Sequence, residues 1–370
     1  MQPYPRTWTD IDLPALGHNL REVKKRIADD NVAVALVTKA DAYGHGLVPV
    51  SRYALRNGCD WAAVATVQEG IALRDAGIDA RIMALSPILD IEAEQAVFYD
   101  LDVLTENVAT VKALDTASQS VGRPARVHLK VDTGLHRFGC SPDEAVTLGL
   151  EIKTFENVRL VGIAQHFADS SRDPDFTMVQ IKRWQDTLAS CERAGLSFEI
   201  IQAANSAGTI KYPESRGNLV RVGIIGYGID PFDLLEGDAR PVMRWTARVT
   251  ALRRAAKGDP VGYSGTYTLT RDSILATVGA GYGDGYPRTL SNKGLVEIRG
   301  QQASVVGLVC MDQIIVDVTD IAGASIGDEV SLIGGSVQVP LLARLAETNS
   351  HEIVTRIMSR VPRRYHYDSA

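Results

Sequence analysis

Residues 32–46 read VAVALVTKADAYGHG, and this stretch carries the pattern on which the fold prediction rests. Its apolar, β-branched first half predicts a buried β-strand. Lys39 follows where this strand ends, and an acidic residue, a tyrosine, two glycines and a histidine come after it. A lysine at the end of a strand is usually only a solvated charge. Its role therefore depends on what the rest of the chain places beside it.

Similar apolar runs recur along the first 240 residues, and helical patterns separate them. Continuous apolar strands of this kind are typical of a parallel sheet that is covered on both faces. The clearest helix pattern follows Asp12, which is placed to cap it, and carries Pro14 in its first turn. Another helix pattern stops at Gly195. About eight strands alternating with helices predict an N-terminal (β/α)8 TIM-type barrel, with strands beginning near residues 32, 61, 81, 101, 126, 158, 198 and 219.

The pattern changes from about residue 245 onward to short β-rich runs broken by glycines. Most of these runs have no helix pattern between them, which predicts mainly antiparallel strands. A last helix pattern over residues 341–361 closes the chain. The predicted fold class is therefore α/β, with a barrel over residues 1–240 and a mainly antiparallel β domain over residues 241–370.

The composition argues against several classes of function. The chain has 370 residues, a formal net charge of −6 and a pI of about 5.7, so no basic surface indicates nucleic-acid binding. No apolar run has the length of a membrane helix, and the N-terminal sequence lacks the pattern of a signal peptide. We expect reduced thiols in a cytoplasmic protein and no metal site, because the four cysteines lie far apart; they are Cys59, Cys140, Cys191 and Cys310.

Polar residues follow the predicted strands at the edge where a barrel of this type holds its active site. The segments NSAG (205–208) and RVGIIGYG (221–228) have small side chains, which let backbone N–H groups approach phosphate oxygens. A lysine amine near a phosphate-bearing ligand points to pyridoxal phosphate, whose aldehyde condenses with lysine. The polar set at the barrel mouth comprises Lys39, Lys130, Asp132, His166, Asn205, Ser206, Arg221 and Gly223.

Over nearly its whole length the chain resembles the bacterial alanine racemases, a family that depends on pyridoxal 5'-phosphate. KADAYGHG (39–46) is similar to the family's cofactor-lysine motif, which implies a Schiff base between the cofactor and Lys39. HLKVDTGLHRFG (128–139), QHFADSS (165–171) and AANSAG (203–208) resemble further barrel motifs. The resemblance assigns cofactor binding to Tyr43, Asn205, Ser206, Arg221, Gly223 and Ile224, a catalytic role to His166, substrate binding to Arg137, and a lysine that is often carbamylated to Lys130.

The second domain carries three more motifs of the family. VGYSGTY (261–267) resembles the segment of the second catalytic base, here Tyr263. GYGDGYPR (281–288) and VCMDQ (309–313) resemble segments near the substrate. The resemblance implies that Tyr282 lies at the substrate entrance and that Met311 and Asp312 lie near the substrate carboxylate.

Two departures from the family pattern bear on the substrate. Leu308 stands where the family usually has an arginine, and His351 stands where a tyrosine normally touches the cofactor phosphate. A histidine can still donate a hydrogen bond to phosphate, but the shape and polarity of the pocket change. The sequence therefore leaves open whether alanine, serine or a broader range of amino acids is the substrate.

The resemblance implies a racemase that works with two bases on opposite faces of the amino acid. Lys39 would serve the proton of the D-enantiomer, and Tyr263 from the partner subunit would serve that of the L-enantiomer. Because a phenol has a pKa near 10, His166 and Arg221 would have to lower the pKa of Tyr263. Arg221 would also meet the pyridine nitrogen. A head-to-tail homodimer with shared sites follows, as does a role in supplying D-alanine for peptidoglycan.

Three other functions are alternatives to alanine racemisation. A serine or broad-specificity racemase of the same fold fits the two departures. A decarboxylase of basic amino acids has a similar architecture but lacks the tyrosine motif at Tyr263. A non-catalytic pyridoxal phosphate-binding protein would resemble the barrel alone. The β domain and its motifs favour a racemase over the last two.

Overall fold

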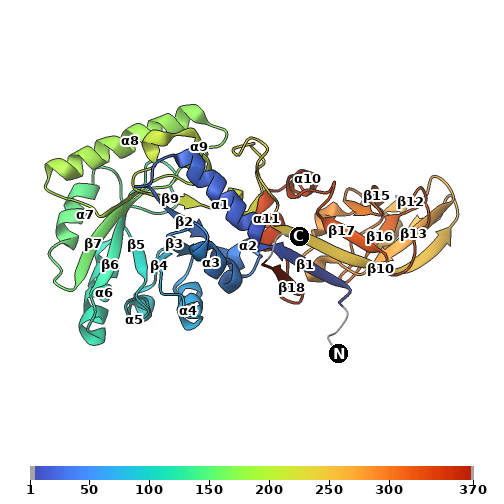
Figure 1. Cartoon of the computed structure of the whole chain (residues 1–370), viewed down its shortest axis with the longest axis horizontal. Coiled ribbons are helices and arrows are strands. Elements are labelled where there is room, and N and C mark those ends of the chain that lie inside the picture. The colour runs from blue at the N-terminus through green and yellow to red at the C-terminus, as the bar shows by residue number, and fades with distance from the viewer. Residues whose placement is uncertain (1–4, 368–370) are drawn as a thin grey trace.

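Within residues 5–367, the part of the chain that the computed structural model describes, eight parallel strands form the predicted barrel (Figure 1). Their order is β8-β7-β6-β5-β4-β3-β2-β9. The two ends of this sheet meet, because the Asn218 N–H donates to the Ile201 carbonyl at 3.1 Å and the Arg221 N–H donates to the Ala204 carbonyl at 3.0 Å. The strands are β2 (Ala33–Val37), β3 (Trp61–Val64), β4 (Arg81–Ala84), β5 (Asp102–Thr105), β6 (Ala125–Lys130), β7 (Val158–Ala164), β8 (Ile200–Gln202) and β9 (Leu219–Val222).

Helices cover the outside of the barrel, and the two predicted in detail are confirmed. Helix α1 (Leu13–Ile27) begins after Asp12, whose Oδ1 accepts the Ala15 N–H at 2.9 Å. Helix α8 (Pro174–Arg193) ends just before Gly195, which has a φ of 78°. The other barrel helices are α3 (Leu47–Arg56), α4 (Val67–Asp75), α5 (Ala93–Phe98), α6 (Val108–Val121), α7 (Ala145–Ile152) and α9 (Ser206–Lys211).

A second sheet forms the other lobe of the molecule, in the order β13-β16-β15-β14-β17-β10-β1-β18 over the described residues (Figure 1). Its pairings are antiparallel except between β1 and β18, so the mainly antiparallel prediction is confirmed. The strands are β10 (Met243–Ala255), β13 (Ser273–Val278), β14 (Leu295–Ile298), β15 (Gln301–Val305), β16 (Ile314–Asp317), β17 (Glu329–Ile333) and β18 (Arg363–His366), with a separate pair β11 (Pro260–Val261) and β12 (Tyr267–Thr268).

The first strand of the chain, β1 (Thr7–Asp12), belongs to this second sheet. It pairs antiparallel with β10 and parallel with β18, so both ends of the described chain meet in one sheet (Figure 1). A continuous apolar core runs from Leu16 in α1 to Trp245 in β10 and thus joins the two lobes. The first four and last three residues, which the predicted domains include, lie outside the described residues.

The single helix predicted over residues 341–361 is wrong. The chain forms two short helices there, α10 (Val339–Leu345) and α11 (Ser350–Thr355). Glu347 between them has a φ of 59°, which no right-handed helix accommodates. Asn349 then starts the second helix, because its Oδ1 accepts the Glu352 N–H at 3.0 Å.

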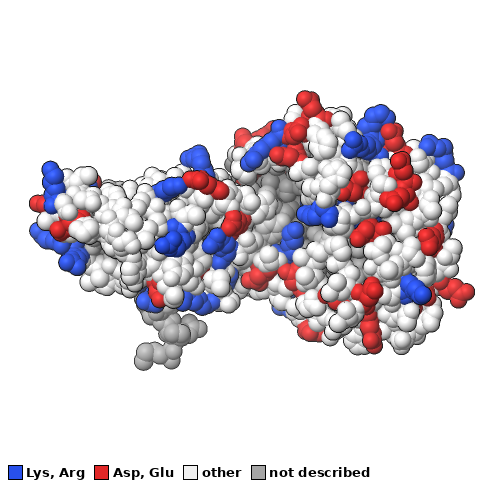
Figure 2. Space-filling view, turned by 180° about the vertical axis from the view of Figure 1, so that it is seen from behind, with Lys and Arg blue, Asp and Glu red and all other residues white. Residues whose placement is uncertain are grey.

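The surface shows no grouping of one sign of charge on the face drawn in Figure 2, where positive and negative side chains are mixed. No helix between residues 5 and 367 combines the length and apolar composition needed to cross a bilayer. Over the same residues, no group of three or more His, Cys, Asp or Glu side chains could hold a metal ion.

Candidate active site

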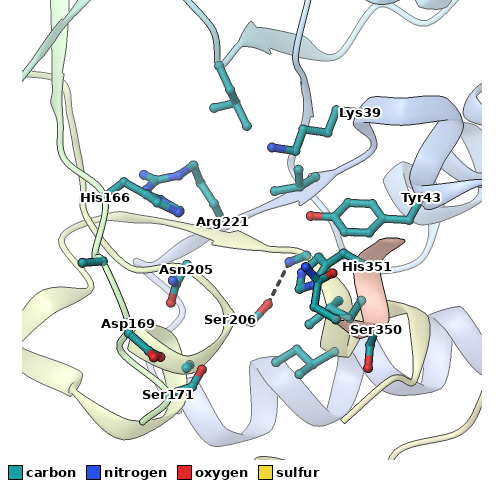
Figure 3. A pocket seen from close by; sticks show the side chains of 18 of the residues that line it. Lys39, Tyr43, His166, Asp169, Ser171, Asn205, Ser206, Arg221, Ser350 and His351 are labelled. Atoms are coloured by element: carbon teal, nitrogen blue, oxygen red, sulfur yellow. Dashed lines mark hydrogen bonds between the residues drawn. The ribbon is translucent and has the colours of Figure 1, made fainter. Parts of the chain in front are cut away.

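A cavity of about 1000 Å³ opens at the carboxyl ends of the barrel strands (Figure 3). It brings together the residues that the sequence predicted for the barrel except Asp132, whose Oδ1 instead accepts the N–H groups of Gly134 and Leu135 at 2.8 Å. Helix α11 contributes His351 to one wall. The predicted residues that line it are Lys39, Tyr43, Lys130, Arg137, His166, Asn205, Ser206, Arg221, Gly223, Ile224 and His351.

The turn that carries Lys39 has an unusual backbone. The four residues after it, 40–43, have φ values of 52°, 55°, 53° and 54°, so they form a left-handed turn without a glycine. Such a conformation costs each L-residue roughly 1–2 kcal/mol. Glu69 in α4 compensates in part, because its Oε1 accepts the Ala40 N–H at 2.7 Å while its Oε2 accepts the Ala65 N–H at 2.7 Å. The strained turn therefore has a fixed anchor.

Glycine completes this turn at a point where the chain meets the second lobe. Gly44 has a φ of 77°, and a Cβ built on it would lie 2.3 Å from the carbonyl oxygen of Val354. The Asp41 carboxylate accepts the Leu47 N–H at 2.7 Å and closes the loop. Sequence reasoning gave Glu69 no role, although its position three residues after Thr66 marks a capping box, which the structure contains.

The amine of Lys39 extends into the cavity toward Arg221 and His166 (Figure 3). Burial lowers its pKa below the ordinary lysine value, and the positive charges of Arg137 and Arg221 act in the same direction, whereas Glu69 opposes them. A lowered pKa increases the fraction of neutral amine at neutral pH, which is the nucleophilic and basic form.

Arg221 is buried, and among residues 5–367 no carboxylate accepts a hydrogen bond from it. Its guanidinium donates to the carbonyl oxygens of Gln165 and Ala203 at 2.8 and 3.0 Å, and to Gln202 Oε1 at 2.8 Å. Burial, together with the charge of Arg137, lowers its pKa to about 10, so it is still a cation at neutral pH. The site thus keeps an uncompensated positive charge next to the cavity.

His166 is held in one protonation state by this arginine. Arg221 Nη2 lies 3.2 Å from His166 Nδ1 and can only donate, so Nδ1 is the acceptor and the ring proton is on Nε2. Burial and the charge of Arg221 lower the His166 pKa well below its ordinary value. His166 is therefore a neutral imidazole in this site.

A phosphate-sized cradle lies on the opposite wall of the cavity. The Gly223 N–H donates to Ser206 Oγ at 2.9 Å, as the dashed line in Figure 3 shows. A Cβ on Gly223 would lie 2.8 Å from the Tyr43 hydroxyl and 3.8 Å from Ser206 Oγ. Burial raises the pKa of Tyr43 to about 12, so its hydroxyl keeps its proton and can donate it to an anion. These residues fit a phosphate group, because only glycine leaves the space between two hydroxyls open.

Two further side chains support this cradle. Asn205 Oδ1 accepts the Gly208 N–H at 2.9 Å and the Ser170 hydroxyl at 2.8 Å, which fixes the loop before Ser206. The His351 ring lies 5.6 Å from the Tyr43 ring, between centroids. Desolvation and then the charge of Lys39 lower the His351 pKa, which makes it neutral near pH 7. His351 thus lies beside the cradle, where the sequence placed it.

Lys130 lies deeper in the cavity wall, at the end of β6. Its Nζ donates to the Val131 carbonyl at 2.7 Å and lies 5.2 Å from the Phe138 ring centroid. Burial lowers the Lys130 pKa to about 8, with the charge of Arg221 adding to the effect. The Arg137 guanidinium contacts the same ring, at 5.8 Å from its centroid, and is more exposed.

The remaining predicted site residues do not reach this cavity. Tyr263, Tyr282 and Met311 lie in the second lobe with 70%, 40% and 54% of their surface exposed. Asp312 is near them and forms an ion pair with Arg360 at 2.7 Å, and Arg360 also contacts Asp284. The structure therefore separates the predicted residues into a cavity set in the barrel and an exposed set in the β domain.

Comparisons with known proteins follow the same division. Residues 11–231 match the sequence profile of the family described as "Alanine racemase, N-terminal domain", and residues 242–365 match "Alanine racemase, C-terminal domain". The curated alanine racemase of Halothermothrix orenii is 38% identical over 97% of this chain and 96% of its own length. That of Symbiobacterium thermophilum is 40% identical over 98% of both chains.

Solved structures agree over the whole chain. The alanine racemase from the D-cycloserine producer Streptomyces lavendulae has a TM-score of 0.94 and 33% identity, covering 100% of this chain and 99% of that one. The alanine racemase from Bartonella henselae, solved with covalently bound pyridoxal phosphate, has a TM-score of 0.89 and 29% identity, covering 98% of this chain and 100% of that one.

Proposed function

Because the chain belongs to the alanine racemase family of isomerases, we propose that it interconverts L- and D-alanine with pyridoxal phosphate on Lys39 and two catalytic bases. The observation that carries the proposal is the content of one cavity. It combines a lysine of lowered pKa, a cradle of two hydroxyls and a buried arginine that pairs with no carboxylate in the described part of the chain. The proposal includes a cytoplasmic enzyme that supplies D-alanine for peptidoglycan.

The residues that would hold the cofactor follow from this geometry. Lys39 would provide the covalent attachment, while Tyr43, Ser206 and the Gly223–Ile224 backbone would receive the phosphate. Asn205 fixes the loop beneath, and Arg221 would face the ring nitrogen. Bound pyridoxal phosphate withdraws electrons from the Cα of the amino acid and thereby acidifies its proton. Since Arg221 has no acceptor of its own, it favours an unprotonated ring nitrogen and moderates this withdrawal.

Racemisation needs a proton acceptor on each face of Cα, and the cavity supplies one. Lys39 acts on one face and handles the proton of the D-enantiomer. Tyr263 is the second base, handling that of the L-enantiomer, and it comes from a second copy of the chain. Its 70% exposure in the β domain, outside its own cavity, supports this arrangement. A head-to-tail homodimer with shared sites follows.

Arg221 and His166 assist the second base. A tyrosine with a pKa near 10 is a weak base at neutral pH unless its phenolate is stabilised. The buried cation Arg221 and the Nε2–H of neutral His166 would stabilise a phenolate once Tyr263 enters the site. We propose Arg137, Met311 and Asp312 for the substrate carboxylate and Tyr282 for the entrance.

Lys130 is proposed as a carbamylated residue. Carbamylation requires a neutral amine, and burial lowers the Lys130 pKa to about 8, so this form is accessible at neutral pH. The modification replaces a buried cation by an anion next to two arginines, Arg137 and Arg221. Intact mass of the native protein in bicarbonate, with Lys130→Ala as the control, checks the assignment.

The experiment that tests the main proposal is a chiral separation of products. The purified protein is incubated separately with L-alanine and L-serine, and each enantiomer is followed by chiral chromatography. Conversion of alanine much faster than serine supports the proposal. Turnover of serine at an equal or higher rate replaces it by the second candidate, a serine or broad-specificity racemase. Turnover of neither, with cofactor bound, contradicts both.

The second candidate rests on His351 and Leu308. An imidazole beside Tyr43 presents a polar edge where a tyrosine would fill the pocket with a larger ring. His351→Tyr should therefore lower kcat/KM for serine more than for alanine. His136→Tyr, at an exposed loop position, is the matched control and should change neither value.

A further inference from the structure

A chain of buried hydrogen bonds runs through the barrel from Arg221 to Asp102. Arg221 Nη1 donates to Gln202 Oε1 at 2.8 Å, and the Gln202 amide donates to His128 Nδ1 at 3.2 Å. His128 Nε2 then donates to Asp102 Oδ2 at 3.0 Å. Gln202, His128 and Asp102 each have 0% of their surface exposed. This chain of hydrogen bonds therefore connects the cavity with the first residue of β5, which lies well away from the strand ends that form the site.

The donors and acceptors of this chain allow one direction only. A guanidinium has no acceptor, so Gln202 must turn its oxygen toward Arg221 and its NH2 group toward His128. His128 Nδ1 must then be unprotonated, and its proton lies on Nε2, facing Asp102. A proton on His128 Nδ1 would bring two donors, this N–H and the Gln202 NH2 group, against each other. Turning the Gln202 amide over would remove that conflict but would place its NH2 group against the Arg221 guanidinium, which is also a donor.

The far end of the chain is a fixed negative charge. Asp102 Oδ1 accepts from Arg126 Nε at 2.7 Å, and its Oδ2 accepts from Arg81 Nη2 at 2.5 Å. Burial acts to raise the Asp102 pKa, but the hydrogen bond from His128 and the charges of Arg126 and Arg81 outweigh it and leave the pKa lowered. Asp102 is therefore ionised at neutral pH and holds the His128 proton in place.

The position of His128 is determined by its surroundings. A Cβ on Gly162, its partner in β7, would lie 2.2 Å from His128 Nδ1, so only glycine leaves room for the ring. The pairing of β6 with β7 shifts register between Val127 and His128, where β7 carries one extra residue, and this shift brings Gly162 opposite His128. The Trp61 ring meets the imidazole edge-on, with centroids 6.2 Å apart.

Arg221 depends on such a support because neutral groups alone accept its hydrogen bonds in the described part of the chain. Its acceptors within residues 5–367 are two carbonyl oxygens, the Gln202 amide oxygen and the His166 ring, and none of them is a carboxylate. The carbonyl groups fix one end of the guanidinium, Nη2, and Gln202 fixes the other, Nη1. The NH2 group of Gln202 in turn is held by His128 Nδ1 and Met83 Sδ, each at 3.2 Å. The plane of the guanidinium thus depends on residues outside the cavity.

We propose that Gln202, His128 and Asp102 are positioning residues for the racemase reaction, which set the orientation of Arg221 toward the cofactor and His166. This inference rests on the proposed function, because the predicted effect on kcat presupposes racemase activity. The orientation of a bound cofactor can nevertheless be measured without turnover. Removing the Gln202 amide leaves Arg221 Nη1 without its acceptor. Displacing the His128 ring instead takes the acceptor away from the Gln202 NH2 group, so that amide no longer holds the guanidinium in one orientation.

The test compares two ways of breaking the chain with one control. Gln202→Met removes the amide at similar volume, and Gly162→Ala displaces the His128 ring while every polar side chain is kept. Val127→Ala, a buried neighbour of His128 in β6, loses core packing without touching the chain. Each holoenzyme is measured for thermal stability, the dissociation constant of pyridoxal phosphate, visible circular dichroism of the bound cofactor, and kcat and KM for alanine.

The proposal predicts that Gln202→Met and Gly162→Ala change the visible dichroism and lower kcat about tenfold, the effect of one hydrogen bond to a charged group. KM should stay within about twofold, because neither variant touches the substrate. Val127→Ala should lower thermal stability alone. If both chain variants behave like Val127→Ala, the inference is overturned. If Gln202→Met does not fold, Gly162→Ala decides. An inactive wild-type enzyme would instead contradict the proposed function, and the dichroism would still test the chain.

Discussion

The carboxylate of Glu69 accepts the backbone N–H of Ala40 at 2.7 Å, directly behind the lysine that we assign to the cofactor. This contact holds a left-handed turn of four consecutive non-glycine residues, which is unfavourable on its own. The other oxygen of Glu69 accepts the N–H groups of Ala65 and Thr66 at the start of α4. One side chain therefore fastens the reactive turn to a neighbouring helix.

Glu69→Gln should loosen this turn, because an amide offers only one acceptor oxygen for these N–H groups. We expect a loss of about 1–3 kcal/mol in the free energy of unfolding and at least about a tenfold increase in the dissociation constant of pyridoxal phosphate. Chemical denaturation measures the free energy of unfolding, and fluorescence titration measures the dissociation constant. Glu151→Gln, at an exposed position in α7, is the control and should change neither. Unchanged cofactor binding in Glu69→Gln would show that the turn keeps its conformation without the Glu69 carboxylate.

Gly223→Ala should fill the phosphate cradle, because the added Cβ would lie 2.8 Å from the Tyr43 hydroxyl. We expect the dissociation constant of pyridoxal phosphate to rise by about tenfold or more. Tyr43→Phe removes the hydroxyl and one hydrogen bond, so the dissociation constant of pyridoxal phosphate should increase roughly two- to tenfold. In the double variant the added Cβ no longer meets the Tyr43 hydroxyl. The increase in the dissociation constant should therefore be smaller than the product of the increases in the two single variants. Effects that simply multiply would argue against a shared cradle.

Much of the barrel was predictable because its signals are local. Apolar strands, the Asp12 cap of α1 and the stop at Gly195 each depend on a few neighbouring residues, and all are confirmed. Strand β1 is not predicted from the sequence, since its partners β10 and β18 lie more than 200 residues away along the chain. The interruption between α10 and α11 is not predicted, because Ala346 and Ile353 on either side of it are seven residues apart and would share one face of a continuous helix.

The candidate site likewise contains residues that the sequence could identify and residues that it could not. Residues at strand ends, such as Lys39 and Arg221, could be chosen because a barrel gathers them at one mouth. Gln202 and His128 could not, since their role depends on which side chains point inward and meet across the barrel. Glu69 carried a local signal, the capping box, but nothing in the sequence connects it to the backbone of Ala40.

The lowered pKa of Lys130 makes the stability of the protein depend on pH in a defined direction. The folded state has a pKa of about 8, against about 10.4 for an unfolded lysine. Between these values the unfolded chain binds a proton that the folded one does not, so stability rises with pH through this window. Below pH 8 both states are protonated, and the buried charge destabilises the fold.

Lys130→Met should therefore stabilise the protein most below pH 8, and the gain should shrink between pH 8 and 10. Thermal unfolding in bicarbonate-depleted buffer measures it, because carbamylation would remove the cation. Lys112→Met, at an exposed position in α6, should give a small difference that does not vary with pH. A gain for Lys130→Met that is equal at pH 6 and pH 10 would contradict the assignment of a buried cation.

Shared active sites make a prediction for mixed dimers. Lys39→Ala and Tyr263→Phe should each be nearly inactive, but half of the dimers formed from an equal mixture carry one of each. In such a hybrid, one of the two sites keeps both bases. Co-expression should therefore restore about a quarter of wild-type activity. Activity no greater than that of the two inactive variants would place both bases in one subunit.

The central claim, that two bases act on opposite faces of the amino acid, is tested most directly by Cα–H exchange in D2O with Tyr263→Phe. Lys39 is intact in this variant, so D-alanine should exchange its Cα proton for deuterium and remain D-alanine. L-alanine should exchange far more slowly, because the base on its side is missing. Mass spectrometry after chiral separation reads both at once. Equal exchange of the two enantiomers, or racemisation at the wild-type rate, would contradict the account.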